Sequence, residues 1–457
     1  MRDLLPIGIL LVVIFLVVRR LPKVELGHTP AFLRRRTLNW LPLGLTYSFL
    51  YMGRYNLTAF KDAGGLTLEQ FGTVFGVGSA VYGVSFLLNG PLTDRWGGRT
   101  TILLSAAGSA FCNLGMGLAV WAGWRGEDAT LAFSLMYGAN MYFQSFGAVS
   151  IVKVNAAWFH VRERGTFGGI FGILISLGLY FAFDWGRLIA QSLQLEWVFL
   201  VPAGLLIVFF LASALWVRDK PSDTGHPDFD AGDASSGDTS APLPAIVVIK
   251  RMMTNKIILL IAFIELCSGF LRQAILQWYR DFARGIGTAD SFVFTNWGMV
   301  SCIAGITGGI FAGLISDHMF QSRRGPVTAV LYGVMLVGSL IIIPLLWYPY
   351  GISWVIAFMS MAIIGVHGML SGTASQDFGG KKNAGIAVGI IDGFVYIGST
   401  IQAFLYGNLL PSKGSLEAKD ISNWYAWPFA MIPVALIGLV LATRVWHAKP
   451  SKASGAH

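Results

Sequence analysis

The sequence predicts an all-α membrane protein built from two related six-helix halves, with a further helix at the N-terminus. The first observation is composition, since 54% of the residues are hydrophobic and 12% are charged, against about 25% charged residues in typical soluble domains. The second is a series of apolar stretches, each long enough to cross a bilayer. The third is a repeat: an arginine inside an apolar stretch and a Gly-x-x-x-Asp loop recur at corresponding places of the two halves.

Residues 1–37 combine an apolar run with a basic segment. The run covers residues 4–18, which is short for a membrane span and similar in length to the core of a signal peptide. Arg19 and Arg20 follow it, and no small-residue cleavage site is present. We therefore expect a retained anchor or extra helix here, rather than a cleaved signal.

Two sets of six apolar stretches follow. The N-terminal half, residues 38–217, has expected spans at 38–60, 71–93, 100–123, 130–153, 166–186 and 196–216. The C-terminal half, residues 256–443, has them at 256–279, 291–316, 326–347, 352–374, 384–409 and 424–443. Between the halves, residues 218–255 begin with a stretch rich in Asp, Ser, Gly and Pro, which predicts a flexible linker. Residues 444–457 form a short polar tail.

The distribution of Lys and Arg predicts the orientation. If residues 19–37 are cytoplasmic, most of the basic residues fall in cytoplasmic connections, and the opposite orientation reverses that bias. The C-terminus is then cytoplasmic. The net charge of +9 is explained by this topology, so it does not indicate nucleic-acid binding. Short loops, together with three cysteines that all lie in apolar runs, suit a bacterial inner membrane and argue against disulfides or a metal site.

Arg54 and Arg272 lie inside the first and seventh spans. A charge inside hydrocarbon costs at least about 2.5–3.5 kcal/mol on insertion scales, so such residues face a cavity or a partner. Glu265 precedes Arg272 by two helical turns, about 10.5 Å along the axis, which makes direct pairing strained. No carboxylate shares the span of Arg54. Because a guanidinium donates two parallel hydrogen bonds to an oxyanion, the pair predicts an anion site.

The loop after the second span carries a recognisable motif. GPLTDRWGGRT at 90–100 resembles the Gly-x-Leu-x-Asp-Arg-x-Gly-Arg-Arg motif of the major facilitator superfamily, with Gly98 at the first closing Arg position. The resemblance implies a twelve-helix fold whose cytoplasmic loops hold the two halves together in the outward-open state. The residues expected to act in such gating are Asp94, Arg95, Arg99, Glu163, Arg164, Asp317, Arg323 and Arg324.

A narrower resemblance covers most of residues 38–443. The chain is similar to the organophosphate:phosphate antiporter family, which includes glycerol-3-phosphate and hexose-phosphate carriers. The matching patterns lie, in order, at 54–56, 158–172, 271–278, 316–325 and 381–385. This resemblance implies that Arg54 and Arg272 hold the phosphate group. Lys153 stands where the family has Arg or Lys; it is a third candidate for binding or gating, although a lysine there also suits snorkelling to the interface.

Four positions depart from the glycerol-phosphate carriers. Tyr55 and Phe86 stand where those carriers have lysines, Ile175 replaces a histidine, and Gln277 replaces an aspartate. These changes make glycerol-3-phosphate doubtful as the substrate, whereas a bulkier phosphate ester, a sugar phosphate or another organic anion fits as well. The candidates for hydrogen bonds to a polyol are Tyr55, Asn56, Tyr82, Gln273 and Gln277. Ordinary polar packing between helices is an equal alternative for each of them.

Asp392, inside the eleventh span, has no counterpart in the glycerol-phosphate pattern. An intramembrane carboxylate is a functional candidate by default, so Asp392 and Glu265 are candidates for neutralising an arginine, for selecting substrate or for coupling transport to protons. His367, in the tenth span, is interpreted as a packed polar residue.

The expected mechanism follows from the two arginines. An empty cavity that holds both is electropositive and costly to close, because isolated buried charges are poorly solvated. A bound anion compensates it, which favours exchange of inorganic phosphate for an organic phosphate. Two alternatives remain, a proton-coupled symporter of organic anions and a non-transporting sensor of sugar phosphate. No motif for a cofactor or for catalysis is present, and we expect a monomer that is not an enzyme.

Overall fold

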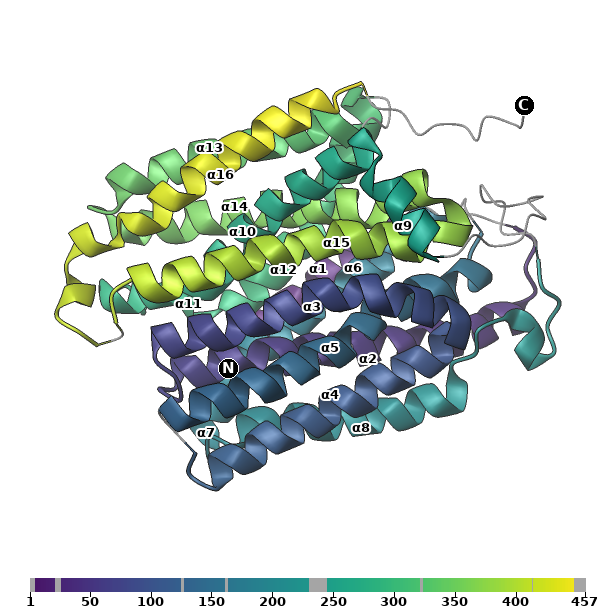
Figure 1. Cartoon of the computed structure of the whole chain (residues 1–457), viewed down its shortest axis with the longest axis horizontal. Helices are drawn as coiled ribbons and strands as arrows, with labels where there is room; N and C mark the ends of the chain where they lie inside the picture. The colour runs from purple at the N-terminus through teal and green to yellow at the C-terminus, as the bar shows by residue number, and fades with distance from the viewer. Residues whose placement is uncertain are drawn as a thin grey trace.

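The structure is a computed structural model that describes residues 5–20, 26–124, 127–160, 163–229, 245–320, 324–412 and 414–447. Within these ranges the regular elements are helices. Their long axes run side by side, with the N-terminal half (purple to teal) below the C-terminal half (green to yellow) in Figure 1. The two halves therefore form a bundle with a seam between them.

The N-terminal half follows the expected order. Its helices are α2 (Pro30–Asp62), α3 (Leu68–Trp96), α4 (Gly98–Trp121), α5 (Glu127–Trp158), α6 (Arg164–Tyr180), the π-helix η2 (Phe181–Trp185), α7 (Gly186–Ser192) and α8 (Trp197–Trp216). Local sequence sets their starts. Thr29 caps α2 by accepting a hydrogen bond from Phe32 N–H, with Pro30 at the first helical position. Thr67 and Gln70 form a reciprocal capping box at α3.

The C-terminal half has one break that was not expected. Its helices are α9 (Ala245–Met253), α10 (Lys256–Gly285), α11 (Phe292–Thr295), α12 (Trp297–Phe320), α13 (Arg324–Leu345), α14 (Ile352–His367), the π-helix η5 (Gly368–Ala374), α15 (Ser375–Leu409) and α16 (Ala426–Arg444). The span expected at 291–316 is divided at Asn296 into α11 and α12. Asp184 of η2 accepts hydrogen bonds from Gly298 N–H and Met299 N–H at 2.8 and 2.9 Å, so the N-terminal half caps α12.

Nine helices in the described part of the chain are long and apolar enough to cross a membrane. Three more helices complete the expected twelve: α2 and α5, and α12, whose apolar stretch is Trp297–Ala312. α2 carries buried polar residues such as Asn39, Thr46 and Arg54. These residues lower its hydropathy, and the bundle rather than lipid surrounds them.

The backbones of the two halves pack most extensively in two helix pairs, α3 with α15 and α6 with α12. Close approach requires small residues. A Cβ atom at Gly72 of α3 would lie 2.7 Å from Ala403 O of α15, and one at Gly305 of α12 would lie 2.5 Å from Ser176 Oγ of α6. Gly308 instead packs on α14, Gly309 has no heavy atom within 4 Å of its Cβ position, and the surroundings of Gly313 lie outside the description. Of these four α12 glycines, Gly305 therefore lies on the seam.

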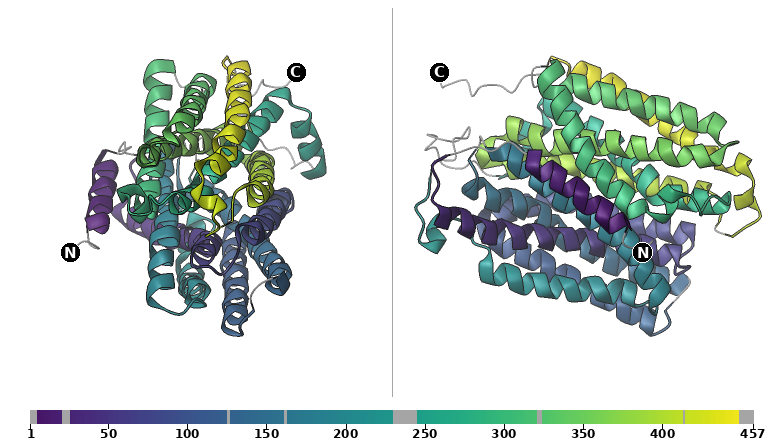
Figure 2. Two further views of the ribbon diagram at one scale, coloured as in Figure 1. Left: turned by 90° about the vertical axis from the view of Figure 1, so that its left-hand side faces the viewer. Right: turned by 180° about the vertical axis from the view of Figure 1, so that it is seen from behind.

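The segment before the first half is helical. α1 (Leu5–Arg20) crosses the bundle obliquely in the right-hand view of Figure 2. Its Leu10 is buried with Ile173 and Tyr180 of α6 and with Met299 of α12. The expected linker, 218–255, also contains a helix, since α9 packs Val248 and Met252 against the start of α10 and against α15. Residues 230–244 of that linker lie outside the described residues.

Candidate substrate site

Arg54 is held by three side chains in the middle of the bundle. It is 1% exposed, and each of its nitrogens donates a hydrogen bond. Nε donates to Gln144 Oε1 at 2.9 Å, Nη1 to Tyr396 OH at 2.7 Å and Nη2 to Tyr82 OH at 2.6 Å. Tyr396 belongs to α15, so one of these bonds crosses between the halves. The guanidinium is thus fixed in position before any ligand binds.

Aromatic rings surround the same guanidinium. Its Cζ lies 4.3 Å from the ring centroid of Tyr82 and 4.7 Å from that of Tyr51. Such contacts attract a cation through the quadrupole of the ring, and they do so more strongly where water is excluded. The tyrosines therefore compensate the burial of Arg54 without a carboxylate, which explains why its span has none.

Arg272 is placed differently. It is 6% exposed, on α10, and its Nε and Nη2 atoms are buried with no hydrogen-bond partner in the described part of the chain. Glu265, on the same helix, interacts with it electrostatically. Leaving a buried donor unpaired costs about 1–3 kcal/mol, and more for a charged group. Two unpaired guanidinium donors on one side of the fork match the geometry of an oxyanion.

A line of polar side chains connects the first and seventh spans beside Arg272. Gln273 Nε2 donates to Tyr55 OH at 3.0 Å, and Gln277 Nε2 donates to Gln273 Oε1 at 3.2 Å. Thr58 Oγ1 then donates to Gln277 Oε1. The structure thus brings together Tyr55, Gln273 and Gln277, three of the side chains singled out for a polyol, on the two helices that carry the arginines.

Two other candidates lie elsewhere. Asn56 Nδ2 donates to Asn113 Oδ1 at 2.7 Å and to Val198 O at 3.2 Å, so Asn56 packs among helices of its own half and away from the arginines. Lys153 forms an ion pair with Asp94, with 2.6 Å between Nζ and Oδ1, and its side chain is 41% exposed. These positions favour interhelical packing for Asn56 and a role at the loop for Lys153.

The expected gating residues contact their own halves. Lys153 and Asp94 pair within the N-terminal half, Arg99 N–H donates to Asp219 Oδ1 at 2.9 Å, and Glu163 pairs with Arg36. Arg95 is exposed, and Arg324 Nη1 donates to Ser316 Oγ at 3.4 Å. The side chains of Arg164 and Asp317, and all of Arg323, lie outside the described residues. The hydrogen bonds and ion pairs given above for these loop residues, within the described ranges, do not join the two halves.

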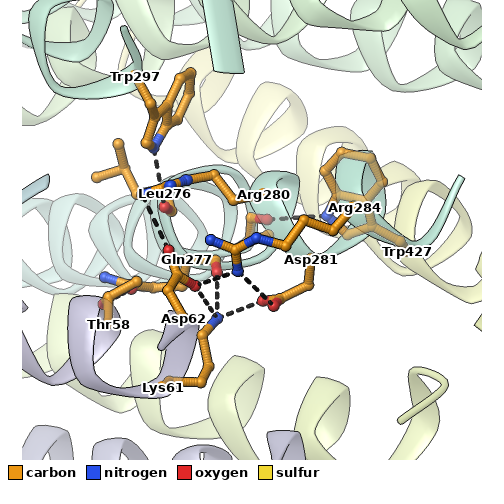
Figure 3. A network of polar contacts seen from close by, with 11 residues as sticks. Thr58, Lys61, Asp62, Leu276, Gln277, Arg280, Asp281, Arg284, Trp297 and Trp427 are labelled. Carbon is orange, nitrogen blue, oxygen red and sulfur yellow. Dashed lines mark hydrogen bonds and ion pairs between the residues drawn. The ribbon is translucent and has the colours of Figure 1, made fainter. Parts of the chain in front are cut away.

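The halves instead meet through charges at the C-terminal ends of α2 and α10, a set that sequence reasoning missed. We call Lys61, Asp62, Arg280, Asp281 and Arg284 the closure network (Figure 3). Lys61 pairs with Asp281, Arg280 Nη1 lies 3.0 Å from Asp62 Oδ2, and Arg284 Nη1 lies 2.8 Å from Asp62 Oδ1. The sequence does carry a signal for this network, since charged residues follow both Arg54 and Arg272 by about two helical turns.

The closure network is buried. Lys61 is 0% exposed, and Arg280 and Asp281 are 2% and 5% exposed. Each of the five charged side chains has a partner of opposite charge. Removing one member of a buried pair is destabilising by about 3–5 kcal/mol, because the other charge is left uncompensated. This end of the seam is therefore firmly closed in this conformation.

The family model of the Major Facilitator Superfamily matches residues 43–403. The chain belongs to the major facilitator superfamily. It is therefore a multi-pass membrane protein of the transporter class rather than an enzyme, and the expected twelve-helix fold is confirmed. A solved bacterial homologue of the human lysosomal transporter Spinster has the same fold, with a TM-score of 0.65 at 14% identity, covering 92% of this chain and 97% of that one.

Relatives at about a quarter identity confirm the narrower resemblance. The glycerol-3-phosphate transporter of Bacillus subtilis is 26% identical over 447 residues, covering 91% of this chain and 94% of its own length. The membrane sensor protein UhpC of Salmonella typhimurium is 25% identical, covering 90% and 91%. A probable hexose phosphate transport protein of Chlamydia trachomatis is 23% identical, covering 88% and 89%. Because these relatives include both a transporter and a sensor, experiment must distinguish the two activities.

Proposed function

We propose that this superfamily member exchanges an organic phosphate ester for inorganic phosphate by alternating access, with Arg54 and Arg272 binding the phosphate group. The observation that carries the proposal is the pair of buried guanidinium groups, one from each half, with two donors of Arg272 unpaired among the described residues. Relatives named as glycerol-3-phosphate and hexose phosphate carriers support it.

The hydrogen bonds suggest how the phosphate is held. Phosphate oxygens accept from Arg272 Nε and Nη2, the two donors that lack a partner. Tyr396 OH and Tyr82 OH already accept from Arg54, so each hydroxyl has its own proton left to donate to a phosphate oxygen. Arg54 then acts through these tyrosines and through its charge, while Arg272 provides the direct contact.

Alternating access requires a seam that opens at one end at a time. We propose that the closure network lies on the outer side of the membrane and that the C-terminus is cytoplasmic, as the Lys and Arg distribution predicts. In this conformation the buried ion pairs between α2 and α10 close the site to the outside. Outward opening breaks them, and a phosphate bound between one arginine from each half favours reclosure.

The polar line beside Arg272 supports a hydroxyl-bearing substrate. Tyr55, Gln273 and Gln277 already exchange hydrogen bonds with one another, so a polyol can replace these bonds with its own hydroxyls. The ring of Tyr51 lies 5.8 Å from that of Tyr55, and such rings suit the apolar face of a sugar ring. We therefore propose a sugar phosphate over glycerol-3-phosphate.

A sensor is the second candidate, because UhpC matches the chain over as much of its length as the transporter does. A sensor binds the same phosphate ester at the same arginines but moves none across the membrane. Binding and flux must therefore be measured on the same preparation.

The test uses proteoliposomes that contain the full chain and are loaded with phosphate, beside unloaded vesicles. Uptake of radiolabelled phosphate only into loaded vesicles, with inhibition by hexose phosphates, would support exchange. Arg272→Lys is expected to lose this uptake, whereas Arg444→Lys, the same change at an exposed position at the end of α16, is expected to keep it. Binding of a hexose phosphate in detergent without uptake into either kind of vesicle would establish the sensor instead.

A further inference from the structure

Two carboxylates and a histidine lie together in the C-terminal half, and the mechanism above uses none of them. Glu265 of α10 is 0% exposed, and its Oε2 lies 3.0 Å from Nδ1 of His367 at the end of α14. Asp392 of α15 is 8% exposed, and its Oδ1 accepts a hydrogen bond from Ser371 Oγ at 2.5 Å. Asp392 interacts electrostatically with His367, Glu265 and Arg272. The three groups therefore form one charge system with the anion site.

Unpaired atoms mark this system as incomplete without a ligand. Glu265 Oε1 is buried and has no hydrogen-bond partner in the described ranges, and the same holds for Nε and Nη2 of Arg272. A buried acceptor and two buried donors on one helix are costly. An anion completes Arg272, and a proton on His367 would offset the negative charge of Glu265 beside it.

The backbone beside these groups is also unusual. His367 is the last residue of α14, and the π-helix η5 that follows contains Ser371. π-Helical turns are rare and occur frequently at functional sites. Here the wide turn lies between the histidine that contacts Glu265 and the serine that contacts Asp392. Both carboxylates are thus held by this short segment.

The empty site is not electropositive once the two carboxylates beside the arginines are included in its charge. Arg54 and Arg272 contribute two positive charges, and Glu265 and Asp392 contribute two negative ones, so the sum is zero when His367 is neutral. A phosphate ester adds about −1.5 to −2 at neutral pH. The loaded site is then negative inside a low-dielectric bundle, which is costly unless a cation joins it. A proton is the only cation that needs no ligand cage.

The other polar groups around these three residues are cysteine and tyrosine side chains rather than histidines. Cys267 of α10 and Tyr332 of α13 interact electrostatically with Glu265, and Tyr332 OH donates to Ile264 O at 2.5 Å. Tyr82 of α3 interacts with Asp392, and Tyr396 of α15 interacts with Arg272. Histidine is the side chain whose charge ordinarily changes between pH 5 and 8. His367, with a side chain 20% exposed, is more accessible to solvent than Glu265 or Asp392.

We propose that Glu265, His367 and Asp392 form a proton site, and that a proton enters it together with the anionic substrate. The proposal rests on the proposed function, because it requires a phosphate-bearing anion at Arg272. The proton comes from solvent and adds to the lone pair of the imidazole nitrogen that does not face Glu265. No bond of the substrate breaks, and the proton returns to solvent when the substrate leaves.

The first experiment measures protons and binding on one sample. The full chain in weakly buffered detergent solution with a pH indicator receives glucose 6-phosphate, or inorganic phosphate, adjusted to the same pH of 7. Calorimetry gives the amount bound. We expect uptake of about one proton for each anion bound, since one imidazole nitrogen accepts one proton. Binding with no net uptake, or with proton release, would overturn the proposal. Absence of binding would reject the proposed function, and the proton site with it.

Variants locate the proton. Glu265→Gln and Asp392→Asn keep the shape of each side chain and are expected to reduce proton uptake to less than half while phosphate still binds. His367→Gln tests the imidazole at a partly exposed position, where folding is least at risk, and thermal unfolding checks each variant. Glu196→Gln, the same change at a buried position at the start of α8, is the matched control and keeps full uptake. Full uptake in all three site variants would show that the proton joins the phosphate itself.

The pH dependence of affinity gives an independent readout. Linkage makes affinity rise by up to about tenfold for each pH unit of acidification when one proton is taken up on binding. Phosphate itself titrates in this range, so the slope of His367→Gln between pH 8 and pH 6 is compared with that of the wild type. A shallower slope in the variant supports the site, and equal slopes contradict it.

Discussion

Helices α2 and α10 together form two regions that differ in how their charged side chains are paired. At the closure network, Lys61 and Asp62 of α2 face Arg280, Asp281 and Arg284 of α10, and each charge has a partner of the opposite sign. About two turns earlier on each helix, Arg54 faces tyrosines, and Arg272 keeps two buried donors without a partner in the described part of the chain. Arg280 Nε and Asp281 Oδ1 also lack hydrogen bonds there, but every charge of the closure network has an ionic partner, whereas Arg54 and Arg272 form no ion pair within the described residues.

This difference separates a seal from a binding site. Buried ion pairs contribute little net stability, but they penalise any arrangement that separates them. That property suits a contact which must be either fully made or fully broken. Unpaired donors instead store a cost that only a ligand relieves. Burial alone does not distinguish the two regions, since Lys61, Arg280 and Asp281 are about as buried as Arg54 and Arg272; the presence or absence of a partner of opposite charge does.

The largest effect is expected at the seal. Asp281→Asn leaves Lys61 buried without its carboxylate, which disfavours the closed end by about 3–5 kcal/mol. We expect Thr58→Cys, in a background where the three native cysteines are replaced by serine, to react with an impermeant maleimide from outside much faster in this variant. The double change Lys61→Met with Asp281→Leu removes both charges and should restore slow labelling. Equal labelling rates in all of these proteins would mean that the pair does not control opening.

The next effect is expected at the unpaired arginine. Arg272→Lys replaces a fork of donors by a single ammonium, and a hydrogen bond to a charged group is worth about 1.5–3 kcal/mol. Phosphate affinity should fall by roughly tenfold to a hundredfold, as calorimetry in detergent would show, while stability without ligand changes little. A large loss of stability without loss of affinity would mean that Arg272 belongs with the closure network as a structural charge.

A smaller effect is expected at the tyrosines that hold Arg54. Tyr396→Phe leaves Nη1 of Arg54 without its acceptor, at a cost of about 1–3 kcal/mol to the unliganded protein. Tyr82→Phe makes the matched change at Nη2. Both should lower the thermal unfolding temperature without ligand. Each also removes a hydroxyl that is proposed to donate to a phosphate oxygen, so added phosphate should recover less stability in each variant than in the wild type. Recovery equal to that of the wild type would show that these hydroxyls do not contact the ligand.

The smallest effect is expected at the exposed pair of Lys153 and Asp94. Exposed ion pairs contribute about 1 kcal/mol or less, so Lys153→Gln should change phosphate affinity by less than a few fold. The comparison with Asp281→Asn measures what burial adds to an ion pair in this protein. A drop in affinity as large as that of Arg272→Lys would place Lys153 in the substrate site after all.

Some residues were predictable and others were not, for identifiable reasons. Arg54 and Arg272 stood out because a charge in an apolar run has few tolerable places, and the fold followed from periodicity and length. Asn56 and Tyr55 are neighbours in sequence, yet they face different helices, because successive positions on a helix point about 100° apart. The pairing of His367 with Glu265 joins residues 102 positions apart, and no local pattern carries that information.

The sequence by itself determined the membrane class, the twelve spans, the two halves and the two arginines, because hydropathy, charge cost and repeats act locally along the chain. Only the tertiary structure decided which charges are paired. It paired Lys61 with Asp281 across the seam and fixed Arg54 on Gln144, Tyr82 and Tyr396 from three helices. Within the described residues, it left Arg272 with two unpaired donors on the helix that also carries Glu265. Partnership between buried charges depends on how helices pack against one another, and packing is a property of the whole bundle.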